Sequence, residues 1–227
     1  MRETKRRLDL IGVKPEEIDA VILTHEHTDH IKGVGPLCRA FGIPAYLTPK
    51  TRASGAGWLG GGRLTIREFE SGSAFAIGDI HIDPFSISHD AADPVGFTFH
   101  VGAFKVGLAT DLGHATNLVT ERLKGSDALV LESNHDPAML KAGPYPWQLK
   151  QRVSGREGHL SNEDAGRLLA DVLHPGLSHV VLAHISQVNN LPELAFDSAL
   201  ETLQGNSAKN VRLCVAAQDA VGEVICL

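Results

Sequence analysis

Residues 24–30 read Thr24-His25-Glu26-His27-Thr28-Asp29-His30 and directly follow a compact apolar run, Ala20–Leu23. An apolar run of this length is typical of a buried strand. Side chains alternate between the two faces of an extended chain, so His25 and His27 are expected to point the same way. Two imidazoles on one side of a strand end can bind one metal ion together.

Asp29 and His30 follow where the chain is expected to turn into a helix, so their side chains can face a second, adjacent position. Imidazole nitrogen and carboxylate oxygen suit zinc, and also manganese or iron. The alternative is a run of polar loop residues. Metal binding explains better why three histidines and two acidic residues occupy six positions.

The rest of the chain alternates short apolar runs with amphipathic stretches, which predicts an α/β fold of sheets covered by helices. A length of 227 residues favours a single domain covering 1–227. Ser161 followed by Asp164 predicts a capping box at a helix start. Strands are expected at residues 20–23, 45–47, 64–69, 81–87, 96–101, 104–109, 128–131, 180–183, 211–216 and 224–227. Helices are expected at residues 2–11, 31–41, 161–172 and 196–203, a helical turn at Pro15, a flexible loop at 55–62 and a loop-rich insert carrying Pro137, Pro144 and Pro146.

Composition excludes several classes of protein. Hydrophobic residues make up 43% and charged residues 21%, as in soluble globular chains. No apolar run approaches the about 20 residues that span a bilayer, so no membrane partner is expected. Cys38, Cys214 and Cys226 are odd in number and far apart, which favours a reducing cytoplasm. The net charge of −6 argues against a protein coated in positive charge, although bound divalent ions would add positive charge locally.

The spacing His-x-His-x-Asp-His resembles the signature of the metallo-β-lactamase superfamily, which implies an αββα sandwich. The resemblance implies three further ligands at strand ends, His89, Asp111 and His184, and a pair of divalent ions about 3.5–4 Å apart. One ion would be bound by His25, His27, His89 and Asp111, and the other by Asp29, His30, His184 and Asp111.

The segment Gly158-His159-Leu160-Ser161 is similar to one in RNase Z and its relatives. This similarity implies that His159 donates a proton to the leaving oxygen of a phosphodiester, and that Glu132 orients His159. Asp29 and Asp111 would serve as catalytic residues as well as ligands. The alternative is that His159 merely starts a helix and Glu132 is a surface carboxylate.

Several blocks between Ile18 and Ala195, among them ISHDAADPVGFTF and LAHISQVNNLPELA, resemble the YycJ (WalJ, VicX) family. The resemblance implies a cytoplasmic DNA exonuclease that acts from the 5′ end, with a role in DNA repair. Members of that family carry further strands before the first helix, so we expect the first N-terminal strands to be missing. Besides nucleic acid, the partners expected are then a second copy of the chain or another chain that completes the sheet.

The insert Lys141–Arg156 and the following helix start predict contacts to a polyanionic substrate. Basic side chains can follow a phosphate backbone, aromatic rings can stack on bases, and helix N-termini attract phosphate. The candidate substrate-binding residues are Lys150, Arg152, Arg156, Trp147 and Ser161. The alternative is a solvated surface with Trp147 packed on the core.

Two other functions remain open at this point. One is a hydrolase of a small ester, thioester or lactam with the same fold, which would not need His159, Glu132 and the basic insert. The other is a binding or regulatory protein that retains the fold without catalysis, against which the complete set of ligands argues.

Overall fold

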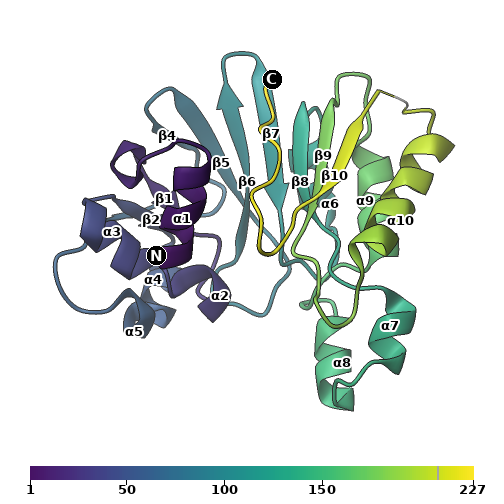
Figure 1. The fold of residues 1–227 in the computed structure, drawn as a ribbon, viewed down its shortest axis with the longest axis horizontal. Coiled ribbons are helices and arrows are strands. Elements are labelled where there is room, and N and C mark those ends of the chain that lie inside the picture. The colour runs from purple at the N-terminus through teal and green to yellow at the C-terminus, as the bar shows by residue number, and fades with distance from the viewer. Residues whose placement is uncertain (209) are drawn as a thin grey trace. The chain divides into compact units, whose positions relative to one another are not determined.

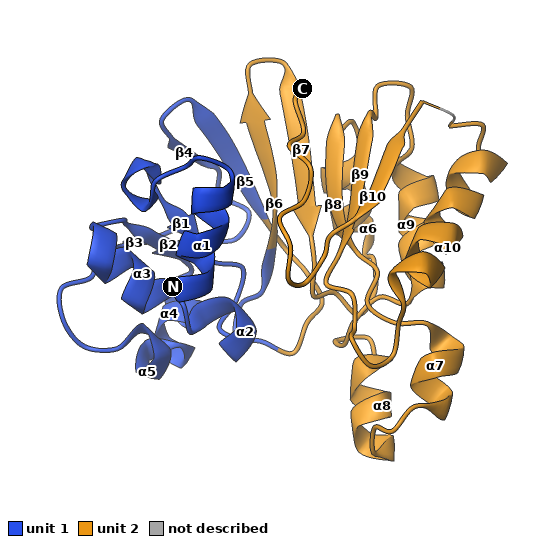
Figure 2. Cartoon of the chain, viewed as in Figure 1, with its two compact units in different colours: residues 1–84, 91–95 blue, residues 85–90, 96–227 orange. Residues whose placement is uncertain are grey.

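A computed structural model of the protein describes residues 1–208 and 210–227, which form two compact units (Figures 1 and 2). Unit 1 consists of Met1–Pro84 and Ala91–Val95, and unit 2 of Phe85–Asp90 and Gly96–Leu227. The chain therefore passes between the units three times in the short stretch around the predicted ligand His89. That residues 1–227 behave as one domain stays a prediction.

Unit 1 contains a parallel sheet in the order β1–β2–β3, with Val21 opposite Ala45 and Ala45 opposite Ile66. Apolar side chains from the strands and helices, among them Ile31 and Leu47, form its fully buried core. Its strands are β1 (Val21–Ile22), β2 (Ala45–Leu47), β3 (Ile66–Glu68) and an antiparallel hairpin of β4 (Phe75–Ile77) with β5 (Ile80–Ser86), whose end lies in unit 2. Its helices are α1 (Arg2–Leu10), the 3₁₀ turn η1 (Pro15–Glu17), α2 (Thr28–Ile31), α3 (Val34–Phe41), α4 (Pro49–Ser54) and α5 (Ala56–Leu59).

Two predictions for unit 1 were wrong. The helix expected over residues 31–41 is split into α2 and α3, and Gly33, a poor helix former, lies at the break as the N-cap of α3. The loop expected at residues 55–62 contains α5, because Leu59 is buried in the core. A Cβ at Gly35 would lie 2.3 Å from the Leu59 carbonyl oxygen, so a glycine is required where α3 and α5 approach each other.

Unit 2 contains five strands in the order β10–β9–β8–β7–β6. β6 pairs antiparallel with β7, and the pairs β7–β8, β8–β9 and β9–β10 are parallel. The carboxyl ends of β7, β8 and β9 are aligned, with Ala109 opposite Leu131 and Glu132 opposite Ala183. The strands are β6 (Val95–Val101, beginning with the last residue of unit 1), β7 (Phe104–Ala109), β8 (Ala128–Glu132), β9 (His179–Ala183) and β10 (Arg212–Val215).

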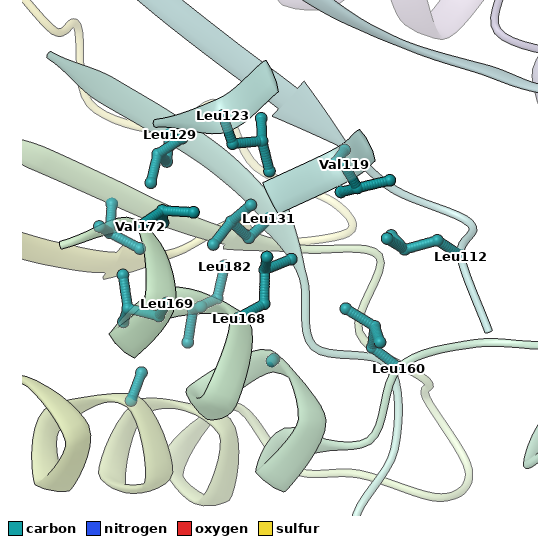
Figure 3. Close-up of a cluster of buried hydrophobic side chains, with 14 of the residues drawn as sticks. Leu112, Val119, Leu123, Leu129, Leu131, Leu160, Leu168, Leu169, Val172 and Leu182 are labelled. Atoms are coloured by element: carbon teal, nitrogen blue, oxygen red, sulfur yellow. The ribbon is translucent and has the colours of Figure 1, made fainter. Parts of the chain in front are cut away.

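Leucines dominate the core of unit 2 (Figure 3). Leu129 and Leu131 of β8 and Leu182 of β9 meet Leu168 and Leu169 from a helix packed on the sheet. No helix in the described parts of the chain is both long and apolar enough to cross a membrane. The helices of unit 2 are α6 (Asn117–Leu123), α7 (Pro137–Ala142), α8 (Trp147–Val153), α9 (Asn162–Val172) and α10 (Pro192–Gly205).

Two predictions for unit 2 were also wrong. The proline-containing insert is not mainly loop, because it contains α7 and α8. Pro137 occupies the first turn of α7, where a missing N–H costs nothing, and the Asp136 carboxylate caps that turn by accepting a hydrogen bond from Met139 N at 2.7 Å. The strand expected at residues 224–227 is absent; Val224 is 78% exposed there.

Candidate metal centre

Unit 1 brings three imidazoles together immediately after β1. His25 is fully buried, and its ring centroid lies 4.7 Å from that of His27 and 4.2 Å from that of His30. The Thr24 hydroxyl lies 3.0 Å from His25 Nδ1 and 3.4 Å from His30 Nδ1. With a hydrogen bond at Nδ1, each ring would bind a metal ion through Nε2. The structure therefore brings the three histidines of this segment together in one unit, and that they bind a metal ion stays a prediction.

The two acidic residues of the same segment differ in their surroundings. The Asp29 side chain is 66% exposed and lies 3.5 Å from His30 Nε2, beside the imidazole cluster. Glu26 instead accepts a hydrogen bond from Ala92 N at 2.8 Å through Oε1. Glu26 therefore fastens residues 91–95 to unit 1, and the sequence pattern contained no indication of this role.

Three side chains of unit 2 come from the aligned ends of β7, β8 and β9. Asp111 follows β7, Glu132 ends β8 and His184 follows β9. Asp111 and His184 have positive φ values of 61° and 56°, which are uncommon for residues other than glycine. Strained backbone of this kind persists where the surroundings enforce it, and it is concentrated at functional sites.

Glu132 connects the predicted proton donor with a predicted ligand. His159 Nδ1 donates a hydrogen bond to Glu132 Oε1 at 2.8 Å, and His184 Nδ1 donates to the same oxygen at 2.7 Å. Ligand atoms of Asp111, Glu132, His159 and His184 all lie within 4.8 Å of one another. The resemblance to RNase Z implies a pairing of Glu132 with His159 alone, and the structure adds the contact with His184.

The second oxygen of Glu132 fixes the backbone on both sides. Glu132 Oε2 accepts hydrogen bonds from Leu112 N at 3.0 Å and Leu160 N at 3.1 Å. Both leucine side chains are fully buried in the core of unit 2 (Figure 3). Asp111 precedes Leu112 and His159 precedes Leu160. The burial of the two leucines and their hydrogen bonds to Glu132 therefore fix the backbone beside Asp111 and His159.

The charge of Glu132 is stabilised although the side chain is completely buried. Burial alone would raise the pKa of this carboxyl group, but the hydrogen bonds from His159 and His184 outweigh burial and lower the pKa. Glu132 is therefore an ionised acceptor that holds both imidazoles, and it is not the surface carboxylate of the alternative interpretation.

His89 lies in the same unit and is also buried. Its Nδ1–H donates to the Gly158 carbonyl oxygen at 3.1 Å, and its ring centroid lies 5.1 Å from that of His159. Burial lowers the pKa of His89, which favours the neutral imidazole that a metal requires. Because Nδ1 donates to Gly158, Nε2 is the nitrogen through which His89 would bind a metal ion.

The donor set of unit 2 fits a divalent cation. Asp111 Oδ1 and His184 Nε2 are 3.3 Å apart. Two donors about 2.0–2.2 Å from one tetrahedral zinc lie roughly this far apart. Asp111 and Glu132 are both buried carboxylates, 1% and 0% exposed, and a nearby cation offsets the cost of burying two negative charges.

The predicted substrate-binding residues lie around α8 and the start of α9. Trp147 is 67% exposed, so it does not pack on the core, and Lys150 donates a hydrogen bond to the Lys141 carbonyl oxygen at 2.7 Å. The Ser161 hydroxyl caps α9: it accepts a hydrogen bond from Asp164 N at 3.1 Å and donates one to Asp164 Oδ2 at 2.6 Å, whereas the reciprocal bond of a capping box, from Ser161 N to the Asp164 carboxylate, is not among the hydrogen bonds of the described residues. The helix cap itself is confirmed, whereas a contact of Ser161 with substrate stays a prediction.

Comparisons with known proteins identify the family of the chain. The family model "Beta-lactamase superfamily domain" matches residues 2–185. Exodeoxyribonuclease YycJ of Bacillus anthracis is 40% identical over 190 residues, which cover 83% of this chain and 72% of the relative. Exodeoxyribonuclease WalJ of Streptococcus pneumoniae serotype 2 is 38% identical over 188 residues, covering 82% and 70%. The chain belongs to the YycJ/WalJ family of the metallo-β-lactamase superfamily.

Solved structures show the same fold for this YycJ/WalJ family member. The metallo-β-lactamase fold protein YhfI of Bacillus subtilis aligns with a TM-score of 0.70 at 20% identity, covering 91% of this chain and 79% of that one. Human tRNase Z, short form, aligns with a TM-score of 0.59 at 16% identity, covering 81% and 79%. The metallo-β-lactamase fold predicted from the histidine motif is therefore confirmed, and this fold implies divalent metal ions.

Proposed function

We propose that the protein is a divalent-metal-dependent exodeoxyribonuclease. The relatives that share 38–40% identity over most of the chain carry that name. The observation that carries the proposal is the arrangement around Glu132, where one buried carboxylate holds His159 and His184 beside Asp111. A proton donor oriented next to metal ligands is what cleavage of a phosphodiester requires, because the leaving alkoxide must be protonated.

Two divalent ions are proposed as cofactors, zinc first, with manganese or iron as alternatives. Unit 1 contributes a cluster of imidazoles, and unit 2 contributes a buried carboxylate with nearby imidazoles, the donor types that such ions prefer. When bound, the ions supply Lewis acidity and lower the pKa of coordinated water. The proposed ligands are His25, His27, Asp29 and His30 from unit 1, and His89, Asp111 and His184 from unit 2.

The side chains of unit 2 have separate tasks in this proposal. Glu132 accepts the Nδ1–H of His159, which leaves His159 Nε2 to hold the proton that passes to the leaving oxygen. The same Glu132 oxygen orients His184 so that its Nε2 faces Asp111. Glu132 is thus a positioning residue for both the acid and a ligand. Cleavage from the 5′ end, a role in DNA repair and a cytoplasmic location are the finer parts of the proposal.

The experiment that tests the proposal combines metal analysis with digestion of end-labelled duplex and single-stranded DNA and of RNA. We expect DNA to be shortened from one end in a metal-dependent manner. Asp111→Asn should abolish turnover and lower the metal content, whereas His159→Ala should keep the metal and lose about 10²–10⁴-fold in rate. Full activity of Asp111→Asn, or hydrolysis of small esters with no action on DNA, would contradict the proposal.

A further inference from the structure

A groove with a volume of about 570 Å³ lies in unit 2 beside the segments that carry His89 and His159. It runs along the loop between α8 and α9 and combines cationic and polar side chains. Its lining includes Asp90, His114, Gln151, Arg152 and Arg156. Arg152 and Arg156 are two of the residues predicted from the sequence to contact a polyanionic substrate.

The loop that forms one wall of the groove is held by its backbone. The Arg156 carbonyl oxygen accepts a hydrogen bond from Ser88 Oγ at 2.8 Å and from His114 Nδ1 at 3.0 Å. A Cβ at Gly113 would lie 2.4 Å from that same carbonyl oxygen, so the two chain segments touch closely. The position from which the Arg156 side chain extends is therefore fixed.

The side chain of Arg156 is fixed as well. Its Nη2 lies 3.0 Å from His114 Nε2. A guanidinium can only donate, so His114 Nε2 must accept and His114 Nδ1 must carry the proton given to the Arg156 carbonyl oxygen. A single neutral imidazole thus holds both the backbone and the guanidinium of an otherwise exposed arginine.

The two arginines of the groove differ in charge balance. Arg152 Nε lies 2.5 Å from Asp90 Oδ2, and this ion pair offsets its charge. No carboxylate of the described residues forms an ion pair with Arg156, although Glu157 is its chain neighbour and also lines the groove. The Arg156 guanidinium is consequently an oriented cation whose remaining N–H groups are available to an anion.

We propose that this groove binds a backbone phosphate of the DNA strand, one that is not itself cleaved, through Arg156, and that His114 is the positioning residue for Arg156. The inference rests on the proposed nuclease function and specifies where the substrate is bound. The planar guanidinium group of arginine can donate two parallel hydrogen bonds to two phosphate oxygens. Because His114 already orients this group, less side-chain entropy is lost when the phosphate binds. Gln151 adds a neutral donor, and Arg156 precedes the proposed proton donor His159 by three residues, on the same loop.

The test measures binding of an internally labelled 20-base-pair duplex to metal-loaded protein carrying His159→Ala, which slows cleavage, at several salt concentrations. We expect Arg156→Ala to raise the Kd about tenfold and to reduce the slope of log Kd against log salt by about one. Arg156→Lys should recover part of the loss, because it keeps the charge without the planar guanidinium group. Arg212→Ala removes the same charge from an exposed pair with Glu223 and should leave the Kd within about twofold.

A double-mutant cycle tests the part assigned to His114. His114→Ala should raise the Kd about threefold in the reference protein and have no further effect once Arg156 is alanine. An equal effect in both backgrounds would show that His114 only supports the fold. Unchanged Kd and salt slope for Arg156→Ala would overturn the phosphate site while leaving the nuclease function intact. Failure of the reference protein to bind duplex DNA would overturn both.

Discussion

Glu132 accepts four hydrogen bonds in a fully buried position, two from imidazole rings and two from backbone amides. At the scale of single residues, this one carboxylate therefore positions two imidazole rings through one oxygen and two backbone segments through the other. Its position at the end of β8 identified it as a candidate, whereas its second imidazole partner depended on the register of β8 with β9.

Glu132→Gln should lower both metal content and turnover. Glutamine keeps the shape, but its neutral amide oxygen is a weaker acceptor and its NH₂ group cannot accept from an imidazole or a backbone N–H. Loss of a group that orients metal ligands typically costs 10–100-fold in metal affinity or activity, and we expect about this loss here. Metal analysis and steady-state kinetics check the prediction. Glu121→Gln, at an exposed pair with Lys124, is the matched control and should behave like the unaltered protein.

His135 provides a pH-dependent contribution to stability. The side chain is 3% exposed, and burial lowers its pKa below the ordinary value. At pH values below about 6.5 the unfolded chain binds a proton that the folded state resists, so the stability present at higher pH is lost as the pH falls.

When the pH is lowered from 7.5 to 5.5, the melting temperature of His135→Gln should therefore fall by less than that of the unaltered protein. This expectation concerns the change with pH and does not depend on the stability of the variant at pH 7.5. His81→Gln, at an exposed position, should show the same acid sensitivity as the unaltered protein. The check is the melting temperature of all three proteins across the pH range. Parallel curves for His135→Gln and the unaltered protein would contradict the prediction.

At the scale of the elements, the segment at the start of α9 both caps the helix and carries the proposed proton donor His159. His159 and Leu160 precede Ser161, the N-cap, so the cap determines where the helix begins and how the proton donor is presented. Gly158 is required here because a Cβ would lie 2.2 Å from the carbonyl oxygens of Arg152 and Val153. The backbone before α9 thus packs directly against the last turn of α8, which fixes the position of His159.

Ser161→Ala should reduce the free energy of unfolding by about 1 kcal/mol, because the N–H of Asp164 loses its acceptor. For a chain of this size the expected drop in melting temperature is roughly 2–4 °C. Ser161→Asn should restore most of the loss, since asparagine is an equally good N-cap residue. Thermal unfolding of the three proteins measures the effect. If Ser161→Ala kept full stability but bound DNA more weakly, the serine would serve the substrate and not the helix.

At the scale of the whole molecule, the predicted ligands are divided between the two compact units, with His25 and its neighbours in unit 1 and His89, Asp111 and His184 in unit 2. Divalent ions held by these proposed ligands would bind the folded chain and not the unfolded one. Metal binding should then contribute to the stability of the whole protein.

Removal of the metal by a chelator should lower the melting temperature, and added zinc should restore it. At a free metal concentration of about 100 times the Kd, binding adds about 2.7 kcal/mol, which corresponds to roughly 5–10 °C for a chain of this length. Differential scanning fluorimetry with a chelator, with zinc and with manganese checks the prediction and ranks the metals. A melting temperature independent of metal would argue against metal binding by the folded chain.

The sequence alone predicted the family fold and the elements whose pattern is local. The strand before His25, the Ser161 cap and the residue ranges of most strands in unit 2 all follow from burial and spacing over a few residues. Predictions from the sequence were wrong where tertiary packing overrode local composition. The glycine-rich stretch became α5 because Leu59 joined the core, and the apolar C-terminal residues formed no strand.

Only the tertiary structure showed that Glu132 also holds His184 and that His114 holds Arg156. These contacts join residues 52 and 42 positions apart. They depend on which strand ends are aligned and on how closely two backbones approach, as at Gly113. Hydrophobic periodicity records which side of an element is buried, but it contains no information about which distant polar groups meet there.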